Sequence, residues 1–305
     1  MAPIPIESLS QLATRRLPMR ISHRSWAWRL LMFAIESPQQ QSELMSAATS
    51  GSEQMLNKVP QLTIYFWIIK IMATTVGETV ADMLAVKLKL GLALASLVVG
   101  AMLLIALYVQ FRSRKYLPAF YWLAVVLISV AGTLITDSLV DKLGVPLWVT
   151  TVVFTVALCL TFVAWYTVEK SLSVHTIQTT RREIFYWSAI LFTFTLGTAG
   201  GDLLSEGAHL GYLVSGLLFA GSIALVALLY YKAGLNAVLA FWFAYILTRP
   251  LGASLGDLLS QPKANGGLGL GTVVTSVAFL VVIVGLVIFR SHRLNDPQRP
   301  TASAS

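Results

Sequence analysis

The sequence predicts an all-α integral membrane protein whose eight transmembrane helices form four parallel two-helix repeats. The first observation is composition. Of the 305 residues, 56% are hydrophobic and 12% are charged, which is more apolar surface than a soluble chain of this length can bury. The second is that apolar runs of about twenty residues, the length that crosses a bilayer, recur from position 61 to position 289. The third is an internal repeat.

The repeat is a frame of Trp, nine residues, Gly, four residues and Asp, with an aromatic residue before each Trp. Its copies begin 55, 65 and 55 residues apart, and four of the six aspartates of the chain occupy this register. Self-similarity at a nearly constant period predicts repeated structural units. The four copies are Trp67–Gly77–Asp82, Trp122–Gly132–Asp137, Trp187–Gly197–Asp202 and Trp242–Gly252–Asp257.

Residues 1–59 are more polar than the rest of the chain and precede the first repeat. Five arginines between Arg15 and Arg29 lead into residues 26–35, an apolar patch too short to span a bilayer. We expect a cytoplasmic tail with a short amphipathic helix held by anionic lipid headgroups. The alternative is a disordered tail.

Residues 60–290 are expected to form the membrane domain, followed by a cytoplasmic tail at 291–305. Each repeat is expected to be a helical hairpin. Its first helix carries the frame, and its second helix, nearly free of ionisable groups, contacts lipid. The repeats are expected at about 60–110, 116–167, 181–231 and 235–290, and the spans at about 62–86, 91–110, 118–139, 146–166, 184–204, 210–230, 235–259 and 269–289.

Loop charge predicts the orientation. With the N-terminus inside, the tails and cytoplasmic loops carry sixteen Lys and Arg, whereas the opposite loops carry four. By the positive-inside rule both termini are expected in the cytoplasm. The net charge of +8 is therefore explained by topology and by attraction to the lipid bilayer. No basic, aromatic-rich soluble domain is present, so a nucleic-acid partner is not expected.

The repeated aspartates are the main candidates for a functional site. Reading back from each Asp in steps of four residues follows one inclined face of a helix. In the first repeat this face carries Glu78 and Lys70, and the second and third repeats place Thr133 and Thr198 at the position of Glu78. The fourth repeat instead has Arg249 two turns before its Asp. The repeats therefore share one carboxylate and differ at the positions behind it.

Carboxylates and Thr hydroxyls are hard oxygen ligands, which suit Mg²⁺, Mn²⁺ or Ca²⁺. Five acidic groups within the spans face two basic ones, so a bound cation would reduce the imbalance. Alternatively, each Asp caps a turn at the membrane surface, and the two basic residues only pin helices together. The predicted cation site comprises Asp82, Asp137, Asp202, Asp257 and Glu78, supported by Thr133, Thr198, Arg249 and Lys70.

The glycines of the frame have two interpretations. Five residues correspond to about 140° around a helix, so Gly77, Gly132, Gly197 and Gly252 face away from the aspartates. They either let neighbouring helices approach closely or mark a break that frees backbone carbonyls beside the carboxylates. The four Trp residues are expected to anchor the helices at the membrane interface. The single Cys159 is expected to be a small buried hydrophobe.

The repeats resemble a bacterial family usually described only as membrane-anchored or multi-pass membrane proteins. Residues 65–70 and 74–79 carry this resemblance in the first repeat, and residues 241–242, 247–252 and 256–257 carry it in the last. It covers about 60–290 and implies a bacterial inner-membrane protein. It implies no particular activity.

No catalytic constellation stands out, so an enzyme and a cofactor are not expected. We predict a transporter or exporter of a cation, most naturally a divalent metal such as manganese. The alternatives are a membrane scaffold that transports nothing, and a proton-coupled carrier of an organic solute.

Overall fold

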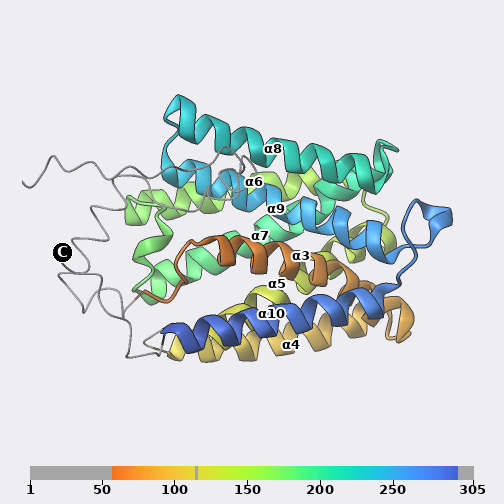
Figure 1. Ribbon diagram of the computed structural model, residues 1–305, viewed down its shortest axis with the longest axis horizontal. Helices are drawn as coiled ribbons and strands as arrows, with labels where there is room; N and C mark the ends of the chain where they lie inside the picture. The colour runs from red at the N-terminus through yellow and green to blue at the C-terminus, as the bar shows by residue number, and fades with distance from the viewer. Residues whose placement is uncertain (1–56, 114–115, 295–305) are drawn as a thin grey trace, which may run out of the picture.

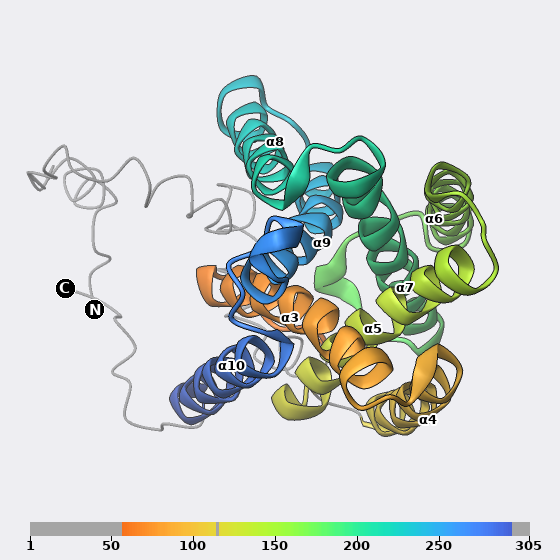
Figure 2. The same ribbon diagram turned by 90° about the vertical axis from the view of Figure 1, so that its right-hand side faces the viewer.

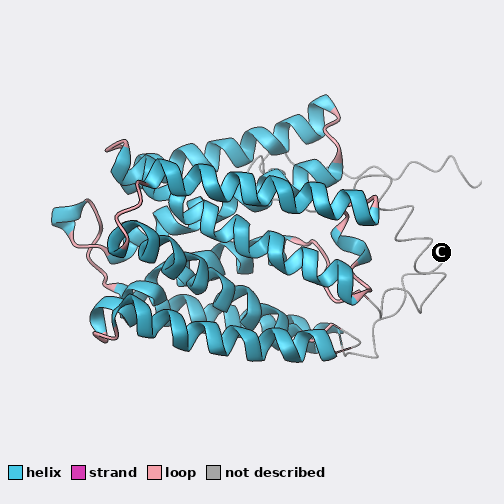
Figure 3. Cartoon of the chain, turned by 180° about the vertical axis from the view of Figure 1, so that it is seen from behind, coloured by secondary structure: helices cyan, strands magenta, loops and turns pink. Residues whose placement is uncertain are grey.

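The computed structural model describes residues 57–113 and 116–294, and all regular secondary structure in these ranges is helical (Figures 1 and 3). The expected interfacial helix at 26–35 lies outside the described residues. Among these described residues, eight helices are long and apolar enough to cross a membrane, in agreement with the predicted number of spans. They are α3 (Ile64–Asp82), α4 (Gly91–Arg112), α5 (Pro118–Asp137), α6 (Leu147–Glu169), α7 (Thr180–Asp202), α8 (Gly211–Ala233), α9 (Ala237–Ser260) and α10 (Thr272–Leu294).

The four helices that carry the frame form an inner ring. In cyclic order, α3 packs against α5, α5 against α7, α7 against α9 and α9 against α3. Between ring neighbours, residues near the start of one helix contact residues near the start of the other, and later residues contact later residues. On α3 and α9, for example, Phe66 faces Phe241 and Glu78 faces Gly256. The ring helices therefore run in the same direction. We call the end where they start the Trp end and the end that carries the aspartates the Asp end.

The second helix of each repeat lies outside the ring, but it does not pack mainly on its own partner. Helix α4 packs against α5, α6 against α7, α8 against α9, and α10 returns to α3. Figure 2 shows this arrangement from the Asp end, with α4, α6, α8 and α10 at the periphery. Each repeat is thus an inner helix followed by an outer helix, but the outer helix packs mainly on the inner helix of the next repeat. Because α10 returns to α3, the four repeats close into a pseudo-fourfold assembly.

Burial separates the two sets of helices. In the apolar windows of the inner helices 56–67% of residues are buried, compared with 11–28% in the outer helices. The outer helices therefore present most of their surface outward, as expected for lipid contact. Cys159 on α6 is exposed, contrary to expectation, because little of α6 is covered by protein.

The glycines of the frame lie where ring helices approach each other. A Cβ atom on Gly77 would collide with Ser129 on α5, one on Gly132 would lie 3.0 Å from the backbone nitrogen of Thr195 on α7, and one on Gly252 would collide with Thr74 on α3. The α-helix continues through each position. Close packing, rather than a helix break, is thus the role of these glycines.

The four Trp residues are not interfacial anchors. Their exposed fractions are 8% or less, and they pack inside the Trp end of the ring beside aromatic residues of neighbouring helices, as Trp187 does against Tyr121. The expectation was wrong because an aromatic belt and an aromatic core look alike in the sequence of one span. Here contacts with neighbouring helices bury all four, including contacts of Trp242 with Phe162 and Trp165 of the outer helix α6.

The helices change at the aspartates. After each of the first three, one π-helical turn follows, a feature common at functional sites. The fourth frame helix instead stays α-helical to Ser260, and a glycine-rich loop, residues 261–271, leads to α10. Backbone N–H groups of this loop donate to the last carbonyls of α9, including Leu268 to Leu258 at 2.7 Å. The π-helical turns are Met83–Lys87, Ser138–Lys142 and Leu203–Gly207.

A glycine-to-alanine pair tests the close approach. In a helix interior this exchange normally stabilises by about 1 kcal/mol, and Gly221→Ala on α8, where nothing lies within 4 Å of the new Cβ, should follow that rule. Gly252→Ala should instead destabilise by roughly 1–3 kcal/mol, because the methyl group overpacks the contact with Thr74. Thermal unfolding of the purified proteins in detergent measures both. Equal shifts in the two variants would contradict close packing.

Candidate functional site

The step-of-four face of each frame helix points to the axis of the ring. Its side chains meet their counterparts from the other repeats in layers, and nearly all are fully buried. From the Trp end these layers are the aromatic layer (Phe66, Tyr121, Tyr186, Phe241), the Lys70 layer (Lys70, Val125, Ile190, Tyr245), the Arg249 layer (Thr74, Ser129, Phe194, Arg249), the Glu78 layer (Glu78, Thr133, Thr198, Ala253) and the Asp layer (Asp82, Asp137, Asp202, Asp257).

The guanidinium of Arg249 occupies the axis in the Glu78 layer. Its Nη1 and Nη2 donate to Oε2 of Glu78 at 3.2 and 3.1 Å, and Nη2 also donates to the hydroxyls of Thr133 and Thr198, the latter at 2.7 Å. Nη1 lies 3.5 Å from the carbonyl of Thr74. The predicted oxygen ligands of three repeats thus converge, and the group that they hold is a cation from the fourth repeat.

The arginine fits because a glycine makes room for it. A Cβ atom on Gly197 of α7 would collide with the Cβ and Cγ of Arg249. The side chain is fully buried, and the side chain of Glu78 is 8% exposed. A buried pair of this kind is costly to break, because either partner alone becomes an uncompensated charge in a low-dielectric interior.

Lys70 is the second cation on the axis, two layers nearer the Trp end. Its Nζ donates to the carbonyl of Tyr245 at 3.0 Å and to the hydroxyl of Thr248. It also lies 3.9 Å from the ring centre of Tyr245 and 4.9 Å from that of Phe194. Aromatic faces attract an ammonium group through their quadrupole. Among residues 57–113 and 116–294, no carboxylate forms an ion pair with Lys70.

The four predicted aspartates follow one turn beyond the Glu78 layer. They are close enough to interact electrostatically: Asp137 with Glu78 and Asp82, and Asp202 with Glu78 and Asp137. Asp257 is buried and the other three are half-buried. Within the described part of the chain, none forms an ion pair with a Lys or Arg side chain.

Hydrogen bonding does not explain the aspartates either. No side-chain capping bond is made by Asp82, Asp137 or Asp202 at the start of the π-helical turns, so the capping interpretation is not supported. Asp82 accepts a hydrogen bond from Nε2 of Gln261 at 3.1 Å. No three His, Cys, Asp or Glu side chains of the described residues gather closely enough to hold one metal ion. The five predicted acidic ligands therefore do not form a single cage in this conformation.

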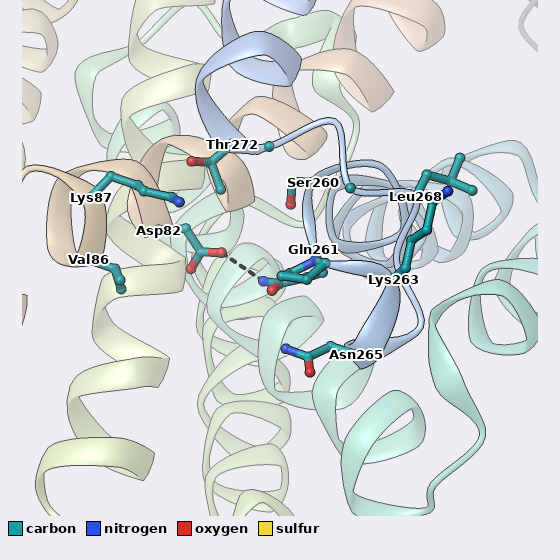
Figure 4. A pocket seen from close by; sticks show the side chains of 12 residues that line it. Asp82, Val86, Lys87, Ser260, Gln261, Lys263, Asn265, Leu268 and Thr272 are labelled. Atoms are coloured by element: carbon teal, nitrogen blue, oxygen red, sulfur yellow. Dashed lines mark hydrogen bonds between the residues drawn. The ribbon is translucent and has the colours of Figure 1, made fainter.

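A cavity of about 660 Å³ opens at the Asp end beside Asp82. Figure 4 shows the carboxylate of Asp82 directed into it, opposite Gln261 from the loop 261–271. Ser260 and Thr272 complete this wall. The cavity lies between the first and fourth repeats, where the longer loop replaces the π-helical turn. It gives solvent a route to one of the four repeated carboxylates.

The repeat frame alone did not identify Gln261 as the partner of Asp82. It also did not show that the inward face extends as far as Tyr121 and Tyr186. Gln261 lies one step of four beyond Asp257, so the stripe extended past the frame is the signal that identifies it. The hydroxyls of Tyr121 and Tyr186 lie 2.6 Å apart. Both residues lie one further step of four along the stripe, which is the signal that identifies them.

A comparison with protein families matches the same four units at residues 65–116, 120–171, 185–235 and 240–293. The chain belongs to the family described as Repeat of Unknown Function (DUF347). Each DUF347 match covers most of one inner helix and the outer helix that follows, so the predicted fourfold repetition is confirmed. No curated protein and no solved structure matches the chain.

The central ion pair predicts an asymmetric mutational response. Arg249→Met removes the cation and leaves Glu78 buried and unpaired, which should destabilise the protein by about 3–5 kcal/mol. The double change Arg249→Met with Glu78→Met leaves no buried charge, so it should recover most of that loss. Thermal and denaturant unfolding in detergent measures both. A double variant as unstable as the single one would show that the charges contribute little.

Proposed function

We propose that this DUF347 protein is a membrane transporter of a small cation, which moves along the axis of the inner ring. One observation carries the proposal: four carboxylates in one repeated register gather at the Asp end, and no Lys or Arg of the described residues pairs with them. A cation substrate supplies the missing compensation.

The energetics support a cation. An ionised carboxylate inside the hydrocarbon costs roughly 2.5–3.5 kcal/mol on insertion scales, so four of them need water, protons or a counter-ion. The four inner helices also direct their carboxyl ends toward this layer, which adds partial negative charge. Hard oxygen donors of this kind favour divalent ions such as manganese.

Arg249 supports the same proposal from within the protein. Glu78, Thr133 and Thr198 already hold a cationic group on the axis. In the proposed mechanism, the substrate approaches through the cavity beside Asp82, gathers carboxylate ligands, and competes with Arg249 for Glu78. Arg249 is then a resident cation that keeps the path closed and electrically balanced when no substrate is bound.

The alternative with specific support is a scaffold. Arg249 and its partners tie α3, α5, α7 and α9 into one network, which is also what a purely structural ion pair does. A scaffold needs Arg249 and Glu78 but has no use for four unpaired aspartates. A proton-coupled carrier of an organic solute remains the third class, and a substrate panel separates it from a metal transporter.

The transport test uses purified protein in liposomes with Mn²⁺. Asp82→Asn, Asp137→Asn, Asp202→Asn and Asp257→Asn each keep the side-chain shape and remove one charge. Each should weaken the apparent affinity for Mn²⁺ by about tenfold or more, because a charged oxygen ligand is lost. Glu169→Gln is the matched control, since this carboxylate lies at the Trp end and is paired with Arg181 and Arg182. Flux that is absent in the wild type for Mn²⁺, Mg²⁺ and Ca²⁺ alike, or unchanged in all four variants, argues against the site.

We also propose a bacterial inner-membrane location with both termini in the cytoplasm and the Asp end outside. Reporter fusions test this orientation. A fusion after Arg182 should give a cytoplasmic signal, and one at Lys263 should give a periplasmic signal. The reverse result at either position contradicts the orientation and would place the carboxylates on the cytoplasmic side.

A further inference from the structure

The segment before α3, residues 57–63, is fixed to other elements at the Trp end; we call it the latch. The backbone N–H of Lys58 donates to the carbonyl of Ile177 at 3.2 Å. The side-chain amide of Gln110 donates to the carbonyl of Lys58 at 3.5 Å. Val59 is buried. These contacts hold the chain beside the start of α7 and the end of α4 before it turns into α3.

The latch bridges opposite members of the ring. Helix α3 packs against α5 and α9, so α7 is the ring helix across from it. Because Lys58 is bonded beside α7 and Ile64 begins α3, the residues between them span the Trp end. The segment between α6 and α7 also contacts the ring at this end: the indole nitrogen of Trp242 on α9 donates to the carbonyl of Leu172 at 3.0 Å.

One buried ion pair holds the latch. Nζ of Lys58 lies 2.6 Å from Oε2 of Glu183 on α7, and the two side chains are 9% and 1% exposed. The same ammonium donates to the carbonyls of Gln110 and Phe111 at 3.4 and 3.2 Å. These carbonyls belong to the last turn of α4, where a cation is favoured by the helix dipole. Loss of the ammonium leaves Glu183 buried without a cation.

Behind the latch, the aromatic layer fills the axis. The hydroxyls of Tyr121 and Tyr186 share a hydrogen bond, and the rings of Phe66 and Phe241 lie 6.4 Å apart. Two layers thus close the Trp end: the aromatic side chains on the axis and the latch in front of them. The Asp end, in contrast, has the cavity beside Asp82.

We propose that the latch is the gate of the Trp end, and that this end opens when the pair between Lys58 and Glu183 separates and residues 57–63 leave α7. The pair suits a gate because both partners regain water when they part, whereas the pair between Glu78 and Arg249 lies deep inside the ring. The role of the gate in transport rests on the proposed function. Closure of the Trp end does not, and it is tested without transport.

The test measures access of a water-soluble maleimide to a thiol behind the latch. In full-length protein carrying Cys159→Ser, the change Phe241→Cys places one thiol in the aromatic layer, directly behind the latch. Lys58→Met and Glu183→Gln each weaken the latch, the second with almost unchanged side-chain shape. Both should raise the labelling rate in detergent by about tenfold or more, because local opening no longer has to break a charge-assisted hydrogen bond.

Two controls separate gating from general loosening. Ala253→Cys places the thiol in the Glu78 layer, on the Asp side of Arg249, and its labelling should not change with Lys58→Met. Arg181→Met removes an exposed ion pair with Glu169 at the same end, 2.6 Å long, and should leave labelling at both thiols unchanged. Unchanged labelling of the Phe241→Cys thiol in folded Lys58→Met and Glu183→Gln proteins overturns the gate. A parallel increase at both thiols also overturns it.

If the latch variants label faster while the wild type carries no Mn²⁺, the gate stands and the proposed function fails. If the wild type transports and labelling does not respond, the function stands and the gate fails. Folding of each variant is checked by its elution and thermal unfolding, and Glu183→Gln provides the second reading where Lys58→Met alone does not fold.

Discussion

The fold depends on the burial of one guanidinium on the axis of four parallel helices. The Nη1 and Nη2 atoms of Arg249 donate to one carboxylate and two hydroxyls from three other helices, and Gly197 leaves the space that its stem requires. A buried charge without such partners costs several kcal/mol. The four inner helices must therefore pack in the same register, so that the side chains of the Glu78 layer lie at one height along the axis. The axial layers toward the Trp end follow from that alignment.

Some positions are the same in all four repeats, and others differ from one repeat to the next. The glycines and aspartates recur in every repeat because each ring contact is built the same way: a glycine of one helix accepts a residue of the next, and α10 returns to α3 to close the cycle. The positions behind the aspartates diverge because the two buried cations on the axis, Arg249 and Lys70, need different residues around them. Glu78 and Arg249 are different residues in one ring, which lets them neutralise each other. The aspartates lie one turn beyond this pair, and no Lys or Arg of the described residues forms an ion pair with them.

The sequence by itself determined the class, the number of spans and the repeat. Apolar length follows directly from bilayer thickness, and four copies of one frame leave little freedom in where the helices lie. It also identified Glu78, Thr133, Thr198, Arg249 and Lys70 as one inward face, since a step of four residues is a property of any α-helix. The boundaries of the described helices agree with the expected spans to within a few residues for the same reason.

Tertiary structure alone decided which helices are neighbours and what the inward residues hold. An outer helix has the same hydropathy pattern whether it packs on its own repeat or on the next one. The packing of α4 on α5 therefore could not be predicted from composition. Likewise, an interfacial and a buried tryptophan occupy the same place in a span, and only ring closure puts Trp187 inside. Of the predicted oxygen ligands, Glu78, Thr133 and Thr198 converge, and they do so on Arg249, because its side chain is long enough to reach one layer beyond its own backbone. The latch precedes the first repeat, so no periodic signal exists for it, and its contacts arise only from how the chain folds back on the ring.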